Sequence, residues 1–128
     1  MTLYYAQSSG SQSTNSANWT PIPGLTITIP EGVGESALVI VNLPLPYATG
    51  SNYPGINLGI TVNGTLAPVT GGFTYNDQQP QSTGRVPTTL VQSVALSGQG
   101  AQMVVAVWSG VRGSTAIIDS PATLSAIV

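Results

Sequence analysis

Glycine and proline recur every few residues along this chain and restrict it to short extended segments. The 128 residues include 15 glycines and 10 prolines. Both residue types disfavour helix interiors, so long helices are excluded. Between them lie short apolar or alternating runs rich in Val, Ile and Thr, which is the pattern of β-strands. The sequence therefore predicts an all-β fold.

Three of these runs predict strands with different degrees of burial. Leu25–Ile29 alternates polar and apolar residues with period two, which indicates a strand with one buried face. Ser36–Leu43 and Ala101–Trp108 contain continuous apolar runs without helix caps. We expect both to be strands that are buried on both faces.

A β-hairpin is predicted around Asn63-Gly64, which favours a type I′ turn between Ile56–Val62 and Thr65–Val69. Ser8–Thr20 is rich in Ser, Asn and Gln and is predicted to be a polar loop, or a strand edge with weak register. The remaining predicted strands are Leu3–Ala6, Gly72–Tyr75, Thr88–Leu96 and Ala122–Val128.

About nine or ten short strands favour a β-sandwich or jelly roll, and the length favours a single domain over residues 1–128. The two strands that are apolar on both faces must have both faces covered, which is difficult within so small a domain. The core covers one side, and a neighbouring subunit or a loop covers the other. We expect a neighbouring subunit, and hence a homo-oligomer.

The scarcity of charge excludes several classes of protein. Charged residues make up 5% of the chain, against about 25% in an average domain, and the net charge is −2. Phosphate recognition needs a basic surface, so nucleic-acid binding is excluded. The longest apolar runs, Ala37–Val41 and Met103–Trp108, are far shorter than the roughly 20 residues of a membrane span. No basic region precedes an apolar run at the N-terminus, so no secretory signal is expected, and the sequence leaves the localisation open.

Catalysis through histidine or cysteine is impossible, because the chain contains neither residue. The four acids, Glu31, Glu35, Asp77 and Asp119, do not form the spacing of a calcium loop. Two of them suffice in principle for a glycosidase pair, but Glu31 and Glu35 lie in a Gly-rich turn where exposure explains them. No phosphate loop or dinucleotide motif is present. We therefore expect no enzyme activity, no cofactor and no metal.

Arg85 and Arg112 are the only basic side chains, and each lies in a run of small and hydroxyl residues. A guanidinium group offers five fixed hydrogen-bond donors and stacks on aromatic faces. Its partner is either an internal carboxylate or a ligand. Arg112 is close in sequence to Asp119, so an ion pair between them is one alternative. Arg85 has no acid nearer in sequence than Asp77, which favours a ligand role.

A sugar would suit such a chain, because its hydroxyls donate and accept hydrogen bonds while its C–H faces are apolar. A sugar site needs a planar donor, hydroxyl groups and an aromatic wall. For each aromatic residue the alternative is simple packing, and Trp108 fits the core or an interface better than a ligand site. The candidates near predicted loops and strand ends are Tyr47, Tyr53, Phe73, Thr74, Tyr75, Ser82, Thr83 and Trp108.

Several ordered motifs together resemble one bacterial lectin family. The longest is the segment Asn42–Ile56, with the sequence NLPLPYATGSNYPGI. The chain resembles the fucose-binding, tumour-necrosis-factor-like N-terminal domain of the Burkholderia two-domain superlectin, closely from about Asn42 to Ile127. Before Asn42 only Ile22–Leu25 fits. The other motifs are Gly72–Tyr75, Ser82–Pro87, Val111–Ser114, Ile118–Ser120 and Leu124–Ile127.

This resemblance implies a jelly roll that assembles as a homotrimer and binds L-fucose and fucosylated glycans between neighbouring subunits. The family has a further tyrosine where this chain has Asn57, so an amide replaces part of the aromatic wall. The alternative is a structural or adhesive trimeric β protein without sugar binding. By the resemblance, one subunit contributes Tyr47, Ser82, Thr83 and Arg85, and its neighbour contributes Thr74, Tyr75 and Arg112.

Overall fold

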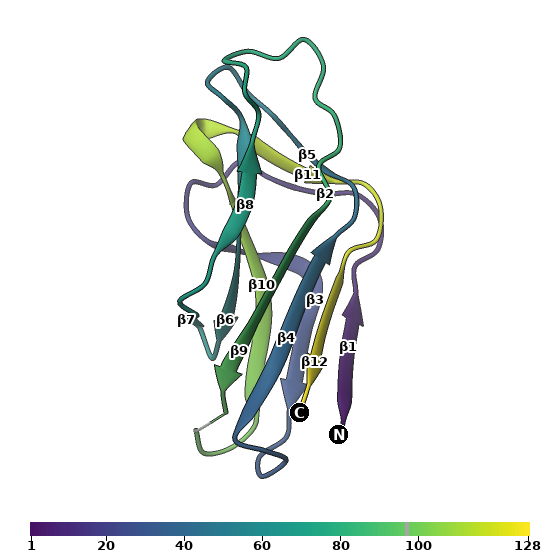
Figure 1. Ribbon diagram of the computed structural model, residues 1–128, viewed down its shortest axis with the longest axis vertical. Coiled ribbons are helices and arrows are strands. Elements are labelled where there is room, and N and C mark those ends of the chain that lie inside the picture. The colour runs from purple at the N-terminus through teal and green to yellow at the C-terminus, as the bar shows by residue number, and fades with distance from the viewer. Residues whose placement is uncertain (97) are drawn as a thin grey trace.

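The computed structural model describes residues 1–96 and 98–128, and in them the protein is all-β with antiparallel sheets (Figure 1). One short 3-10 turn, η1 (Val111–Gly113), interrupts the strands. The strands of the described residues are β1 (Leu3–Gln7), β2 (Gln12–Thr14), β3 (Thr20–Ile29), β4 (Ser36–Leu43), β5 (Pro46–Thr49), β6 (Gly55–Val62), β7 (Thr65–Leu66), β8 (Gly71–Thr74), β9 (Thr88–Ala95), β10 (Gln102–Gly110), β11 (Thr115–Ile118) and β12 (Thr123–Ile127).

The strands form two main sheets and a small third one. The first sheet has the order β1-β12-β4-β9, and the second has the order β3-β10-β6-β7, with β8 also paired to β6. The third, β2-β11-β5, lies in the half of the molecule away from the chain termini (Figure 1). Both termini lie at the opposite end, where Thr2 and Val128 exchange backbone hydrogen bonds of 2.9 and 3.0 Å.

The core lies between the two main sheets and is filled by alternate residues of their strands. Val39, Val41 and Leu43 of β4 are fully buried, as are Leu25 and Ile29 of β3. The period-two pattern of Leu25–Ile29 is therefore confirmed, with one face of β3 buried and the other exposed. Trp108 is 1% exposed and belongs to the core, as its apolar surroundings in the sequence indicated.

The two strands predicted to be buried on both faces differ. Only one face of β4 is buried within the chain, because Leu38 on the other face is 42% exposed. The second half of β10, from Ala106 to Gly110, is buried on both faces. A Cβ added to Gly59 would lie 3.2 Å from the ring of Trp19, and Gly59 pairs with Val107. A segment of the same chain therefore covers this part of β10, and a neighbouring subunit is not needed there.

The hairpin was predicted correctly, although its second strand is shorter than expected. Asn63 and Gly64 have φ angles of 51° and 82°, as a type I′ turn requires, and they join β6 to β7. Strand β7 ends at Leu66 and does not reach Val69.

Two short strands, β5 and β11, were not predicted, whereas β2 agrees with the strand-edge alternative for Ser8–Thr20. β2 lies in the polar Ser8–Thr20 segment, and β5 begins at a proline in a turn-rich stretch. Both are edge strands of the small sheet, where a proline and polar side chains are tolerated.

The pairing of β8 with β6 depends on glycines that allow close backbone approach. A Cβ added to Gly72, whose φ is 138°, would lie 1.9 Å from the carbonyl oxygen of Ile56. A Cβ added to the adjacent Gly71 would make one ordinary contact of 3.7 Å.

We expect Gly72→Ala to lower the free energy of unfolding by about 2 kcal/mol or more, through steric overlap and a strained φ. Gly71→Ala is the matched control and should change it by about 0.5 kcal/mol or less. Urea unfolding followed by tryptophan fluorescence measures both values. Equal stability of the two variants would contradict the close β6–β8 packing.

Candidate functional site

All eight residues predicted for the sugar site are exposed or half-buried, so each is accessible from the surface. They come from β5, β6, β8, the β8–β9 connection and η1. Apart from β6, which runs on to β7, these segments lie mainly in the half of the molecule opposite the termini (Figure 1). These residues are Tyr47, Asn57, Thr74, Tyr75, Ser82, Thr83, Arg85 and Arg112.

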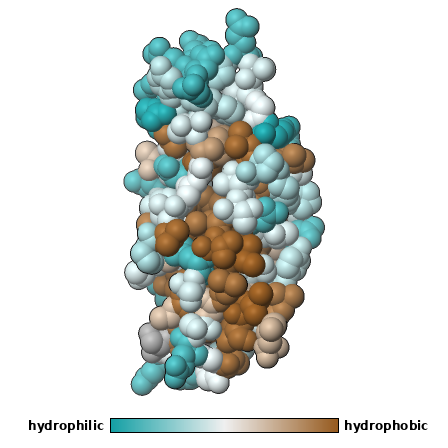
Figure 2. Space-filling model, viewed as in Figure 1, coloured by the Kyte–Doolittle hydropathy of each residue, from teal (hydrophilic) through white to brown (hydrophobic). Residues whose placement is uncertain are grey.

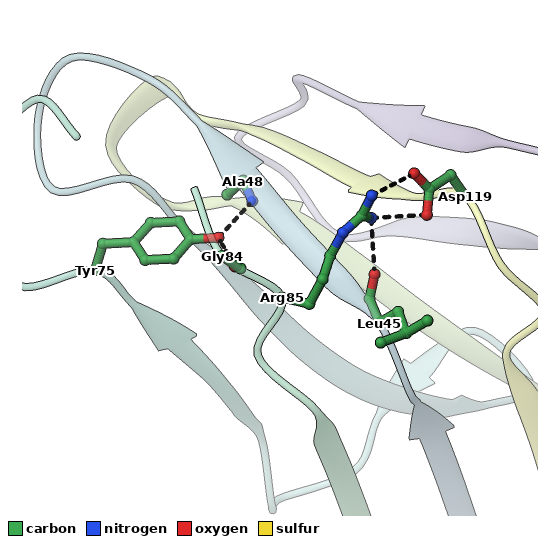
Figure 3. A network of polar contacts seen from close by, with 6 residues as sticks. All are labelled: Leu45, Ala48, Tyr75, Gly84, Arg85 and Asp119. Carbon is green, nitrogen blue, oxygen red and sulfur yellow. Dashed lines mark hydrogen bonds and ion pairs between the residues drawn. The ribbon is translucent and has the colours of Figure 1, made fainter. Parts of the chain in front are cut away.

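Arg85 is held by three groups of its own chain (Figure 3). Its Nη1 and Nη2 donate to Oδ1 and Oδ2 of Asp119, each at 2.7 Å, in a bidentate ion pair. Nη1 also donates to the carbonyl oxygen of Leu45 at 3.2 Å. The guanidinium carbon lies 4.2 Å from the centroid of the Tyr47 ring, so one face of the guanidinium is stacked.

Strand register explains why these groups meet. β5 and β11 are antiparallel, and Pro46 of β5 is paired with Ile118 of β11. The residues just beyond this pair, Leu45 and Asp119, therefore lie side by side at the end of the sheet. The N–H of Val86 donates to the carbonyl of Pro46 at 3.0 Å and places Arg85 against that end.

The ion pair shifts the pKa values of both partners. The hydrogen bonds from Arg85 are the main reason that the pKa of Asp119 lies below its ordinary value. The same hydrogen bonds raise the pKa of Arg85. Both groups stay charged across the neutral range, and together they are electrically neutral.

Tyr75 is bound to the same part of the chain. Its hydroxyl donates to the carbonyl of Gly84 at 2.6 Å and accepts from the N–H of Ala48 at 3.3 Å (Figure 3). Its ring packs edge-to-face on Phe73, with the two centroids 5.5 Å apart. We call Tyr47, Tyr75, Arg85 and Asp119 the Arg85 cluster.

Arg112 belongs to a second group, formed with the turn before β6. Its Nε donates to the carbonyl of Asn52 at 2.9 Å, and its Nη2 donates to the carbonyl of Tyr53 at 2.5 Å. We call Asn52, Tyr53 and Arg112 the Arg112 cluster. Tyr53 and Arg112 both have positive φ angles, 47° and 50°, which is uncommon for residues other than glycine. Strain of this kind often accompanies functional sites.

Buried Ser114 fixes the turn that carries Arg112. Its hydroxyl donates to the carbonyl of Val111 and accepts from the N–H of Gly55 at 3.1 Å. This links η1 to the start of β6, so both sides of the Arg112 cluster are attached to the same point of the fold.

In the part of the chain that the structure describes, the hydrogen bond of the Asn57 side chain goes to neither arginine. The side-chain amide of Asn57 donates to Ser109 Oγ at 3.1 Å, across the β6–β10 pairing. Among the described residues, no hydrogen bond, ion pair or ring contact joins Arg85 to Arg112 or to Asn57.

Two open hollows adjoin these groups. One of about 560 Å³ lies along the β8–β9 connection, from Tyr75 to Ser82, and its walls are mostly amide, hydroxyl and carboxylate groups. The other, of about 380 Å³, is lined by Asn57, Thr74 and Val111 together with neighbouring residues of β6 and β8. Predicted site residues therefore line both hollows.

The structure shows which of the two arginines pairs with Asp119. Arg112 does not pair with Asp119, because both carboxylate oxygens of Asp119 are bound to Arg85. Arg85 was assigned a ligand role because no acid lies near it in sequence, yet its acid partner comes from 34 residues further along the chain. The sequence analysis missed Asp119, Asn52 and Leu45 as parts of the site, because the contacts depend on folding.

In residues 1–96 and 98–128, no three acid, histidine or cysteine side chains gather closely enough to hold a metal ion. No helix in the same residues is long and apolar enough to cross a membrane.

Two solved structures align with most of the chain at low sequence identity. The chain aligns with dimeric latent PorU from Porphyromonas gingivalis at 14% identity and a TM-score of 0.55. The alignment covers 97% of this chain but only 12% of the PorU chain, so the likeness concerns a small part of that protein. The insecticidal delta-endotoxin Cry8Ea1 from Bacillus thuringiensis aligns at 16% identity and a TM-score of 0.46, over 91% of this chain and 19% of that one.

The family assignment comes from the sequence. No curated protein sequence matches the chain. A family model described as the N-terminal domain of Bc2l-C matches residues 6–127, which is nearly the whole chain. This match confirms the resemblance to that lectin family and extends it to the residues before Asn42. The chain therefore belongs to the Bc2l-C N-terminal domain family, and this membership indicates a lectin-type, carbohydrate-binding function.

Proposed function

We propose that this protein is a lectin, without catalytic activity, that binds L-fucose and fucosylated glycans at sites between the subunits of a homotrimer. The observation that carries the proposal is the Arg85 cluster in a chain of the Bc2l-C family. It places a planar donor beside two tyrosine rings at the surface. The exposed Ser82 and the half-buried Thr83 precede Arg85 on the same connection.

A neutral ligand suits the Arg85 cluster. The charge of Arg85 is balanced by Asp119, so the pair offers directed donors with little net charge. The adjoining hollow is walled by amides and hydroxyls, which can donate to and accept from sugar hydroxyls. The rings of Tyr47 and Tyr75 supply apolar surface for the C–H face and the methyl group of fucose.

We propose that the site uses both arginines and takes them from two neighbouring chains. Within one chain the two clusters are held by different backbone segments. We propose that the Arg85 cluster, with Ser82 and Thr83, meets Thr74, Tyr75, Arg112 and Asn57 of a neighbouring chain. Tyr75 already contacts Gly84 of its own chain, so it would lie at the boundary between the two subunits.

We propose that residues 1–128 form one jelly-roll domain. The two main sheets contain eight strands besides the two-residue β7, and we number these eight strands from one to eight in chain order. They are β1, β3, β4, β6, β8, β9, β10 and β12. The two main sheets then have the orders 1-8-3-6 and 2-7-4-5. This alternation between sheets is the connectivity of two Greek keys, which supports the assignment.

The outer face of the first sheet is the proposed trimer surface. Leu3, Tyr5, Leu38 and Val91 point out of this sheet and are 64, 56, 42 and 48% exposed, and half-buried Ile40 lies between them. Cross-strand register places Tyr5, Ser125, Ile40 and Val91 in one row. Figure 2 shows apolar residues gathered over this side of the molecule, whereas the end with the loops is hydrophilic. A patch of this kind typically marks a protein interface.

Calorimetric titration with L-fucose tests the function, with D-galactose and D-mannose as controls. We expect saturable binding of fucose near one site per chain, and weaker or no binding of the control sugars. Absence of heat with fucose would refute the fucose assignment. A glycan array would then distinguish a lectin for another sugar from a structural trimer.

Arg85→Ala should abolish the heat of fucose binding, because the variant lacks the planar donor. The fold and oligomeric state should persist, since an exposed ion pair contributes little to stability. Circular dichroism and sedimentation check both properties. Unfolding or dissociation of this variant would show that the arginine is structural and that the site is assigned wrongly.

Leu38→Asp should dissociate the trimer, because a carboxylate would be buried at the centre of the proposed interface. Light scattering should report a mass near 39 kDa for the natural chain, three times its mass of 13.0 kDa, and near 13 kDa for the variant. Met103→Asp is the matched control, since Met103 is 50% exposed on the other sheet. A monomeric natural chain would contradict the proposed assembly.

A further inference from the structure

We propose that Asp119 is a positioning residue for the lectin site, which fixes the Arg85 guanidinium so that two parallel N–H groups face a pair of adjacent sugar hydroxyls. This inference rests on the proposed function and adds to it a residue that the resemblance did not assign. It also narrows the ligand class to neutral sugars with two vicinal hydroxyls.

The donors of Arg85 can be accounted for one by one. A guanidinium has five N–H groups. Both N–H groups of Nη1 are used, one by Asp119 and one by Leu45. One N–H of Nη2 is used by the other oxygen of Asp119. Among the described residues, no acceptor takes the Nε–H or the second Nη2–H.

The two remaining donors have a defined geometry. The Nε–H and the second Nη2–H point in parallel from the edge of the guanidinium opposite Nη1. One face of the same group is covered by Tyr47 at 4.2 Å. The side chain is 40% exposed, so this free edge can be reached by a ligand. Two parallel donors fit two neighbouring hydroxyl oxygens, as vicinal hydroxyls provide.

Asp119 is the group that sets this orientation. A long, exposed arginine side chain samples many rotamers, and binding must immobilise it unless the protein already has. The bidentate pair fixes both the position and the plane of the guanidinium, whereas the Leu45 carbonyl fixes a single N–H. Without the carboxylate the N–H donors of Arg85 would still be present, but their direction would no longer be fixed.

The pH dependence follows from the sign of the pKa shift. The pKa of Asp119 is lowered from 3.8 by the hydrogen bonds from Arg85. A lowered pKa means that the pair is fully formed above about pH 3.8 and is lost as pH falls through the lower, folded-state value. Arg85 is the charged group that faces Asp119, and the side chains of Tyr47 and Tyr75 lie near Arg85. The chain has no histidine or lysine, so sugar affinity should be constant from about pH 5 to 9.

Titration of the complete chain with L-fucose tests the inference through three variants. Asp119→Asn should raise the dissociation constant about ten-fold, since the amide cannot form the bidentate ion pair. Asp119→Glu keeps the carboxylate and should recover most of that loss. Glu31→Gln is the matched control, because Glu31 lies in an exposed turn between β3 and β4, and it should bind like the natural chain. Unchanged fucose affinity of Asp119→Asn would overturn the inference.

Nuclear magnetic resonance separates this inference from the proposed function. With two arginines in the chain, a ¹⁵N spectrum contains two Nε–H signals. They identify the two side chains. In Asp119→Asn the Nη–H signals of Arg85, which donate to the carboxylate in the natural chain, should show faster hydrogen exchange, while the Arg112 signals stay unchanged as an internal control. If the natural chain does not bind fucose, the proposed function fails, and this comparison still decides the role of Asp119. Equal exchange of the Arg85 Nη–H signals in both proteins would overturn that role.

Discussion

The pairing of β5 with β11 controls the geometry of the candidate site. It is a short edge pairing, from Pro46 to Thr49 and from Thr115 to Ile118. Its register places Leu45 beside Asp119, and it presents Tyr47 next to Ile117. A slip of one residue would turn Tyr47 to the other face of the sheet and separate the two acceptors of Arg85. The orientation of the guanidinium therefore depends on backbone register as well as on the ion pair itself.

The chain has only two basic side chains, and each of these arginines is held by a different kind of acceptor. Arg85 is neutralised by a carboxylate, whereas Arg112 is held by two backbone carbonyl groups that carry only partial charges. The two proposed halves of the site would thus differ, with a neutral fork on one subunit and a cationic group on the other. Two forks of fixed direction suit a ligand that is recognised by its hydroxyl pattern.

The longer strands could be predicted from the sequence, because their buried residues form alternating or continuous apolar patterns. β4 was predicted with its observed bounds, and β6, β9 and β12 to within one residue at either end. β5 and β11 were missed because strands of four residues carry little periodic signal. The Arg85–Asp119 pair could not be predicted, since its partners are 34 residues apart and meet only through the register of those missed strands. Motif resemblance named Arg85 as a site candidate, but it did not name the groups that hold its guanidinium.

The strands β4 and β10 show that an apolar pattern in the sequence does not predict what covers the second face of a strand. Both contain continuous apolar runs, and both were expected to be covered on two sides. Trp19 of the same chain covers β10 near Gly59 and Val107, whereas Leu38 of β4 remains 42% exposed. A continuous apolar run predicts that both faces of the strand are buried, but it does not predict whether the same chain or another molecule covers them. The described residues leave the outer face of β4 partly exposed, and we propose that another molecule covers this face. A second copy is the simplest candidate, because the sugar site is also proposed to form between two chains.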